Sequence, residues 1–228
     1  MKKRIIPVLA AAGMLLLQGC AGGSVTESTI EISKKGAVTQ TSIGTLDADY
    51  YDSDELKSYV EDQIDAYNES EDAIGSVKLK KYKYSASDSS VKLVLKFSDD
   101  ETYADFEQMT FFTGTVEEAK AAGYAFDVTL ITPQEAQSED ASGDASGDDA
   151  AASEAEESGD ASADAAVSDG TQDLALSGTE NVVILQESYH VTVPGEILYV
   201  TQGACSVVSD DTASVDADGA DLVYIIYE

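Results

Sequence analysis

The order of apolar and polar residues predicts regular structure from residue 29 onward. Apolar and polar side chains alternate over Thr29–Ser33 and again over Ala37–Thr45, which is the period of a half-buried strand. Lys34-Lys35-Gly36 between them is typical of a turn, so the two segments predict a hairpin. Over residues 52–67 the apolar positions recur at helical spacing instead and predict an amphipathic helix: Leu56, Tyr59, Val60, Ile64 and Tyr67.

A second hairpin follows this helix. Val77–Tyr84 and Val91–Phe97 alternate on either side of the polar segment Ser85–Ser90, which is typical of a turn. Further along, two pairs have the spacing of a capping box and predict short helices, and one segment alternates like a strand: Ser98 with Glu101, Thr115 with Glu118, and Tyr124–Ile131.

The last part of the chain has the pattern of β-strands throughout. The expected strands are Val182–Gln186, Tyr189–Val193, Ile197–Thr201, Ser206–Val208 and Leu222–Tyr227. A set of strands this small buries too little surface to be stable alone. We therefore expect it to extend or cover the sheet of the first part. The predicted fold class is α+β, with a mostly antiparallel sheet, two or three short amphipathic helices in the N-terminal part and an all-β C-terminal part.

Residues 133–180 interrupt these patterns. The segment contains fourteen acidic residues, no basic or aromatic residue, and repeats of Ala-Ser-Gly-Asp. Such a composition buries too little apolar surface to offset the entropy of ordering, so we expect a disordered acidic linker. Because a long linker lets its two ends approach each other, we expect residues 28–132 and 181–228 to pack together as one body.

The first residues of the chain have the pattern of a secretory signal. Lys2, Lys3 and Arg4 precede an uncharged apolar run from Ile5 to Leu17, which at about 13 residues is too short to span a membrane. The following Leu17-Gln18-Gly19-Cys20 resembles the lipobox of bacterial lipoproteins. The resemblance implies a signal peptide of residues 1–19, a diacylglycerol on the Cys20 thiol and a tether of residues 20–27. Two acyl chains anchor a protein stably, so we expect it on the extracytoplasmic face of the cell membrane.

Several short segments of the chain after the signal are similar to those of an uncharacterised lipoprotein family of clostridia-type Gram-positive bacteria. They are Tyr50-Tyr51-Asp52 through Leu56, Gly114-Thr115-Val116 with Glu118-Ala119, Ala122-Gly123-Tyr124, and Val193-Pro194-Gly195-Glu196-Ile197-Leu198-Tyr199-Val200. The resemblance covers most of residues 25–228 apart from the linker, and it implies no particular activity.

The charge of the chain excludes nucleic acid as a partner, and its few basic residues are concentrated in one segment. The chain has 13 Lys and Arg against 44 Asp and Glu, a net charge of −31, which repels nucleic acid. Ten basic residues remain once the signal is removed, and six of them lie in the second predicted hairpin: Lys78, Lys80, Lys81, Lys83, Lys92 and Lys96. Either they protect a sheet edge from aggregation, or they dock an anionic partner such as wall polymer, lipid headgroups or the protein's own linker.

His190 and Cys205 are the only histidine and the only cysteine besides Cys20, so they are the one candidate pair of base and nucleophile. The alternative is that Cys205 is a small buried apolar residue and His190 an ordinary strand residue. An enzyme needs both side chains in one open cleft, whereas a binding protein leaves them apart or buried.

Two groups of carboxylates outside the linker are candidates for calcium. They are Asp47, Asp49, Asp52, Asp54 and Glu55, and separately Asp216, Asp218 and Asp221. Neither group has the order of an EF-hand loop, and caps or turns explain both, so we expect no metal and no cofactor.

We therefore expect a membrane-anchored extracytoplasmic lipoprotein that binds or scaffolds a partner without catalysis. The expected partners are the membrane, through lipid on Cys20, and a cell-wall polymer or surface protein. The alternative function is a small exported hydrolase that uses Cys205 and His190.

Overall fold

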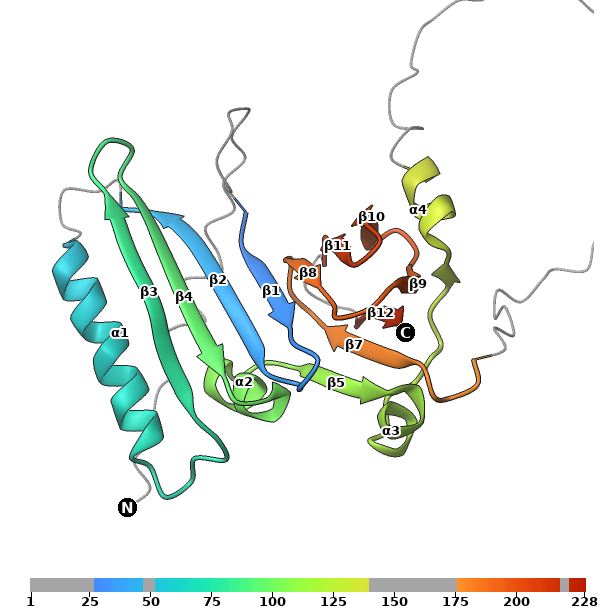
Figure 1. The fold of residues 1–228 in the computed structure, drawn as a ribbon, viewed down its shortest axis with the longest axis horizontal. Coiled ribbons are helices and arrows are strands. Elements are labelled where there is room, and N and C mark those ends of the chain that lie inside the picture. The colour runs from blue at the N-terminus through green and yellow to red at the C-terminus, as the bar shows by residue number, and fades with distance from the viewer. Residues whose placement is uncertain (1–26, 47–51, 140–175, 218–221) are drawn as a thin grey trace, which may run out of the picture.

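The computed structural model describes residues 27–46, 52–139, 176–217 and 222–228, which form two β-sheets and four helices (Figure 1). The first sheet has the strand order β10-β11-β8-β1-β2-β4-β3, and the second has the order β5-β7-β12-β9-β6. Neighbouring strands are antiparallel except for β1 and β8, which are parallel. The predicted α+β fold with a mostly antiparallel sheet is confirmed.

The elements alternate in the first part of the chain and are strands alone in the last part. The strands are β1 (Thr29–Ile32), β2 (Val38–Thr45), β3 (Val77–Ser85), β4 (Ser90–Phe97), β5 (Phe111–Thr115), β6 (Leu130–Ile131), β7 (Asn181–Leu185), β8 (His190–Thr192), β9 (Ile197–Thr201), β10 (Cys205–Ser209), β11 (Thr212–Val215) and β12 (Val223–Tyr227). The helices are α1 (Ser53–Asn68), α2 (Asp100–Glu107), α3 (Val116–Ala121) and α4 (Pro133–Glu139).

Both predicted hairpins are present, and so are the caps of two predicted helices. Gly36 turns β1 into β2 with a φ of +79°, a conformation that glycine adopts at little cost. Asp52 caps α1, because its Oδ1 accepts hydrogen bonds from the backbone N–H groups of Asp54 and Glu55. Thr115 and Glu118 form the predicted capping box of α3.

Two local predictions need correction, and two strands were not predicted. The cap of α2 is Asp99 rather than Ser98, because the Asp99 carboxylate accepts the Thr102 N–H at 2.7 Å. Of the strand predicted at residues 124–131, only β6 pairs with a neighbour. Tyr124, Phe126 and Val128 instead pack their side chains against the smaller core beside the second sheet. The strands β5 and β11 were not predicted, since neither has a clear run of alternating apolar residues.

The folded body extends into the expected acidic linker. Helix α4 occupies the first seven residues of that segment and buries Ala136, which is 2 % exposed, in the main core. At the other end, the Glu180 carboxylate accepts hydrogen bonds from the N–H groups of Ser177 and Gly178. The expectation of disorder is thereby limited to residues 140–175, which lie outside the described residues.

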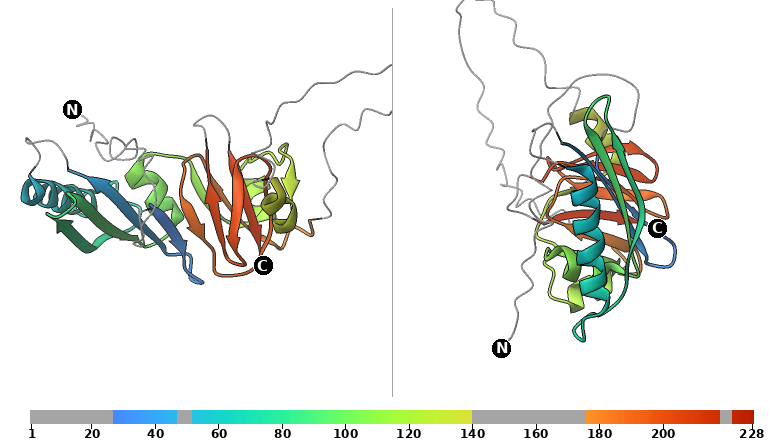
Figure 2. Two further views of the ribbon diagram at one scale, coloured as in Figure 1. Left: turned by 90° about the horizontal axis from the view of Figure 1, so that it is seen from above. Right: turned by 90° about the vertical axis from the view of Figure 1, so that its left-hand side faces the viewer.

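One hydrophobic core joins the two parts of the chain. The inner face of the first sheet is covered at the β3 end by α1 and α2 and towards the β10 end by the second sheet (Figures 1 and 2). The C-terminal strands therefore do both things expected of them: β8, β11 and β10 extend the first sheet beyond β1, while β7, β9 and β12 cover it. A smaller core lies on the far side of the second sheet, under α3.

Strand β12 shows the effect of these layers, because all five of its side chains are buried. Val223 and Ile225 belong to the main core, whereas Tyr224 and Ile226 belong to the smaller one. The outer face of the first sheet, in contrast, is not covered by any of the described helices or strands: along β1, β2 and β8 the buried residues alternate with partly or fully exposed ones. We call this outer side the open face.

Candidate functional site

The β3–β4 hairpin presents lysines on the open face of the first sheet. The register pairs Lys78 with Lys96 and Lys83 with Lys92, while Lys81 pairs with Val94. Residues that pair directly across antiparallel strands share one side of the sheet. The other side of the hairpin enters the core through Val77, Leu95 and Phe97. We call the outward set the lysine face: Lys78, Lys81, Lys83, Lys92 and Lys96.

Protection of a sheet edge accounts for only part of the lysine face. Strand β3 is the edge of the first sheet, so Lys78, Lys81 and Lys83 stand where lysine prevents pairing with another chain. Strand β4, however, pairs with β3 on one side and with β2 on the other. Lys92 and Lys96 therefore lie on an interior strand, and like charges directly opposite each other destabilise a sheet. Edge protection leaves these two residues unexplained.

The residues of β2 next to the lysine face are uncharged. Across β2, the residues paired with Lys96 and Lys92 are Thr39 and Ile43. The first carboxylate met on this side across the strands belongs to Glu31 of β1, two strands from β4, or about 10 Å at the usual strand spacing. Among the described residues, the ion pairs are Lys57 with Glu61 and His190 with Glu27. No carboxylate of the described residues therefore forms an ion pair with the lysine face.

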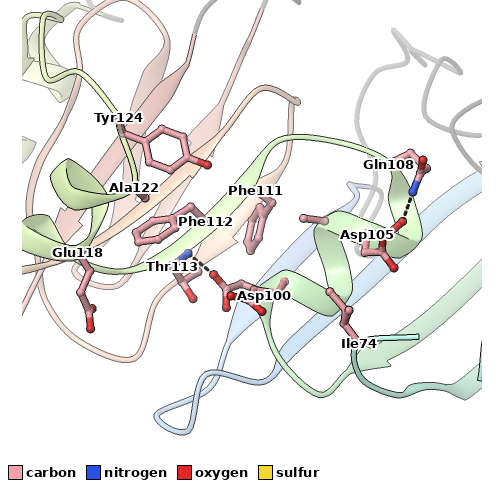
Figure 3. Close-up of a pocket in the computed structure, with 12 residues that line it drawn as sticks. Ile74, Asp100, Asp105, Gln108, Phe111, Phe112, Thr113, Glu118, Ala122 and Tyr124 are labelled. Atoms are coloured by element: carbon pink, nitrogen blue, oxygen red, sulfur yellow. Dashed lines mark hydrogen bonds between the residues drawn. The ribbon is translucent and has the colours of Figure 1, made fainter. Parts of the chain in front are cut away.

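A pocket of about 800 Å³ lies elsewhere, between α2, β5 and α3 (Figure 3). Its lining combines four carboxylates with the aromatic rings of Phe112 and Tyr124; the acidic residues are Asp100, Glu101, Asp105 and Glu118. The two rings lie close together, with centroids 5.2 Å apart. An acidic and aromatic lining of this kind is suited to a cation.

Three of the four carboxylates of this pocket accept hydrogen bonds within the fold. Asp100 accepts the backbone N–H of Thr113 at 2.7 Å, which joins α2 to β5 (Figure 3). Asp105 accepts the hydroxyl of Tyr67 at 2.9 Å, which joins α2 to α1. Glu118 accepts the N–H of its own N-cap residue at 2.8 Å. Three of the four acidic side chains thus have a structural role and the fourth, Glu101, is exposed, so we assign no ligand to the pocket.

Cys205 and His190 do not form a catalytic pair. Cys205 pairs with Val215 and points into the core, whereas His190 pairs with Ser214, the next residue along β11. Because successive residues of a strand point to opposite sides, the thiol and the imidazole lie on opposite faces of the sheet. Burial raises the pKa of the Cys205 thiol to about 12, so almost none of it is thiolate at neutral pH. The structure removes the basis for the hydrolase alternative.

The other residues singled out in the sequence are only partly described. Asp52 serves as the cap of α1 and Asp216 is exposed, whereas Asp47, Asp49, Asp218, Asp221 and the predicted lipid site Cys20 lie outside the described residues. Within the described ranges, no group of three or more His, Cys, Asp or Glu side chains is arranged to hold a metal ion. No helix in these ranges has the length and apolarity needed to cross a bilayer.

Sequence reasoning missed a buried polar cluster, which consists of Gln40, Tyr103, Glu107, Glu187 and Tyr189. Gln40 and Glu107 are 3 % and 4 % exposed. Gln40 Nε2 donates to the hydroxyl of Tyr189 at 3.0 Å and lies 3.5 Å from that of Tyr103. The signal was present in the pattern, because Gln40 takes an inward position two residues after Val38.

Comparison of the chain with protein families, with curated proteins and with solved structures finds no match, so membership of the lipoprotein family stays a prediction.

Proposed function

We propose that this protein is a lipid-anchored extracytoplasmic binding module that holds an extended anionic polymer of the cell wall on its lysine face. The observation that supports this proposal is the position of Lys92 and Lys96. They lie on an interior strand, opposite Lys83 and Lys78, where edge protection does not account for them. An arrangement that costs the sheet stability is explained if a polyanion bridges the paired ammonium groups.

The shape of the lysine face favours a single extended chain over a flat surface. Lys92 and Lys96 are four residues apart on β4, which corresponds to about 13 Å along a strand. Across the sheet, the positive charge is limited to β3 and β4. The open-face residues beyond them include Thr39, Thr41 and Ile43 of β2 and Glu31 of β1. The positive surface is therefore long and narrow. A linear polymer that carries an anion on each repeat fits it better than a bilayer does.

The large negative charge of the whole chain does not prevent such contact. At 0.1 M salt, charges are screened over about 10 Å, so a polymer that touches the lysine face responds mainly to the nearest ammonium groups. The same screening makes the contact sensitive to salt. We expect binding at low ionic strength that weakens steeply as salt is added.

Co-sedimentation with purified cell wall tests the proposal. We expect Lys92→Gln with Lys96→Gln to weaken binding by roughly 30-fold, since each lysine close to an anionic surface contributes about 1 kcal/mol. The matched control is Lys34→Gln with Lys35→Gln, which removes the same charge from the exposed β1–β2 turn and should change binding little.

Three results would contradict the proposal. They are no binding to wall at low salt, equal loss in the two double variants, and binding to anionic vesicles that exceeds binding to wall. The last result would assign the lysine face to lipid headgroups instead. Chain lacking residues 1–20 should be used, so that lipid on Cys20 contributes nothing to sedimentation.

The anchor has its own test in a Cys20→Ala variant. The thioether to diacylglycerol needs the thiol, so the variant should incorporate none of a labelled fatty acid in the producing cells and should not remain in the membrane fraction. Cys205→Ala is the matched control and should be labelled like the wild-type chain, because Cys205 is buried in the core. Equal labelling of wild type and Cys20→Ala would refute lipidation at this residue.

A further inference from the structure

The buried polar cluster contains two oxygen atoms without a hydrogen-bond donor. In the described part of the chain, Gln40 Oε1 and Glu107 Oε1 are fully buried and have no hydrogen-bond partner. A buried acceptor left without a donor costs about 1–3 kcal/mol. The amide of Gln40 interacts with the Glu107 carboxyl group, yet neither of these two oxygens receives a hydrogen bond. A proton on Glu107 reduces the need for a donor, because a protonated carboxyl group is itself a donor.

The charges around Glu107 also favour a bound proton. Helix α2 contributes Tyr103 beside it, β2 contributes Gln40, and the segment between β7 and β8 contributes Glu187 and Tyr189. No basic side chain is among these groups. Burial, followed by the charge of Glu187, raises the pKa of Glu107 to about 7, and Gln40 lowers it in part.

We propose that a proton held on the buried carboxyl group of Glu107 stabilises the joint between α2, β2 and the segment of residues 186–189, and that its loss as the pH rises loosens this joint. Gln40 Nε2 of β2 donates to the Tyr189 hydroxyl at 3.0 Å, and Tyr189 in turn interacts with the Glu187 carboxyl group. With Glu107 protonated, Glu187 is the one carboxyl group of the buried polar cluster that can carry a charge.

Loss of the proton adds a second charge to the buried polar cluster. An ionised Glu107 is a buried charge, and two carboxylates, Glu107 and Glu187, then share one poorly solvated region. The contact that suffers joins the first sheet to the segment leading from β7 into β8. The joint is therefore a pH-sensitive device, and it is independent of the lysine face.

The sign of the pH dependence follows from the raised pKa. Glu107 binds its proton more tightly in the folded state than in the unfolded state, where its pKa has the ordinary value of 4.5. The stability that the proton contributes is therefore fully present below pH 4.5 and is lost as the pH rises through about 7. In Glu107→Gln the amide replaces the protonated carboxyl group at all pH values. The folding equilibrium constant of the wild type, relative to this variant, should fall on the order of a hundredfold between pH 4.5 and pH 8.

Two measurements on the chain of residues 21–228 test the device. Denaturant unfolding of wild type and Glu107→Gln should show this divergence, with Glu101→Gln as the control, because Glu101 is exposed on the same helix. Carbon-13 NMR of the Glu107 carboxyl group in the wild type should show a midpoint near pH 7 and needs no variant to fold. A midpoint below pH 5, or parallel unfolding profiles for wild type and Glu107→Gln, would overturn the proposal.

Discussion

Replacing Phe97 by alanine should reduce the free energy of unfolding by about 3–5 kcal/mol. Phe97 has no exposed surface and lies at the end of β4, where α2 meets the first sheet. Its ring contacts Tyr103 with centroids 5.0 Å apart and Phe106 with centroids 5.7 Å apart. The substitution removes the transfer free energy of the ring and leaves a cavity that these rigid neighbours cannot close.

Denaturant unfolding measures this effect. Tyr84→Ala is the control, because Tyr84 belongs to the same hairpin but is 37 % exposed, and it should cost about 1 kcal/mol or less. If Phe97→Ala and Tyr84→Ala cost the same, the centre of the core does not lie at the junction of β4 and α2.

An equally large loss, again about 3–5 kcal/mol, is expected for Tyr224→Ala. Tyr224 lies at the centre of the smaller core, where it is 1 % exposed and its ring lies 5.0 Å from that of Phe126. Its hydroxyl donates to the carbonyl oxygen of Ala125. Tyr224→Phe keeps the ring and removes only this hydrogen bond, so it should cost about 1 kcal/mol.

The Tyr224 variants also test whether the chain is one cooperative unit. Strand β12 supplies residues to both cores, so we expect the first sheet to unfold in the same transition as the second. Near-ultraviolet circular dichroism reports on the tyrosines of both sheets, and far-ultraviolet circular dichroism reports on the backbone. Two separate transitions in Tyr224→Ala would show that the two sheets unfold independently.

The sequence predicts those elements whose period is clean. Helix α1 and the β3–β4 hairpin follow from apolar spacing, because each buries one face and exposes the other. The all-β character of the C-terminal part follows for the same reason. The joining of both parts in one core follows from size, since residues 181–228 alone bury too little surface.

Elements that lack such a period were missed. Strand β11 is Thr-Ala-Ser-Val, whose inward residues, Ala213 and Val215, are too small and too few to stand out. The segment with Tyr124, Phe126 and Val128 does alternate, but it does so because it lies over the second sheet without pairing. Periodicity reports which side chains are buried, and it does not report which backbone groups pair.

The lysine face could be predicted in part. Six lysines in one hairpin are evident in the sequence. That β3 is an edge strand and β4 an interior strand depends on the pairing of β2 with β4, which α1 and β3 separate in the sequence. The buried polar cluster was beyond prediction for a similar reason. Its members come from β2, α2 and the segment before β8, and only the tertiary fold brings them together.

The position of β1 determines how the molecule carries a mechanical load. β1 is the first strand of the described chain, and it lies between β2 and β8. A pull on its N-terminal end along the strand axis loads the hydrogen bonds to both neighbours at once, in shear, so they resist together rather than opening one by one. β2 pairs with β4, which carries part of the lysine face, and β8 is connected along the chain to β7 and β9 of the second sheet. Tension applied at the N-terminus therefore spreads into the whole body.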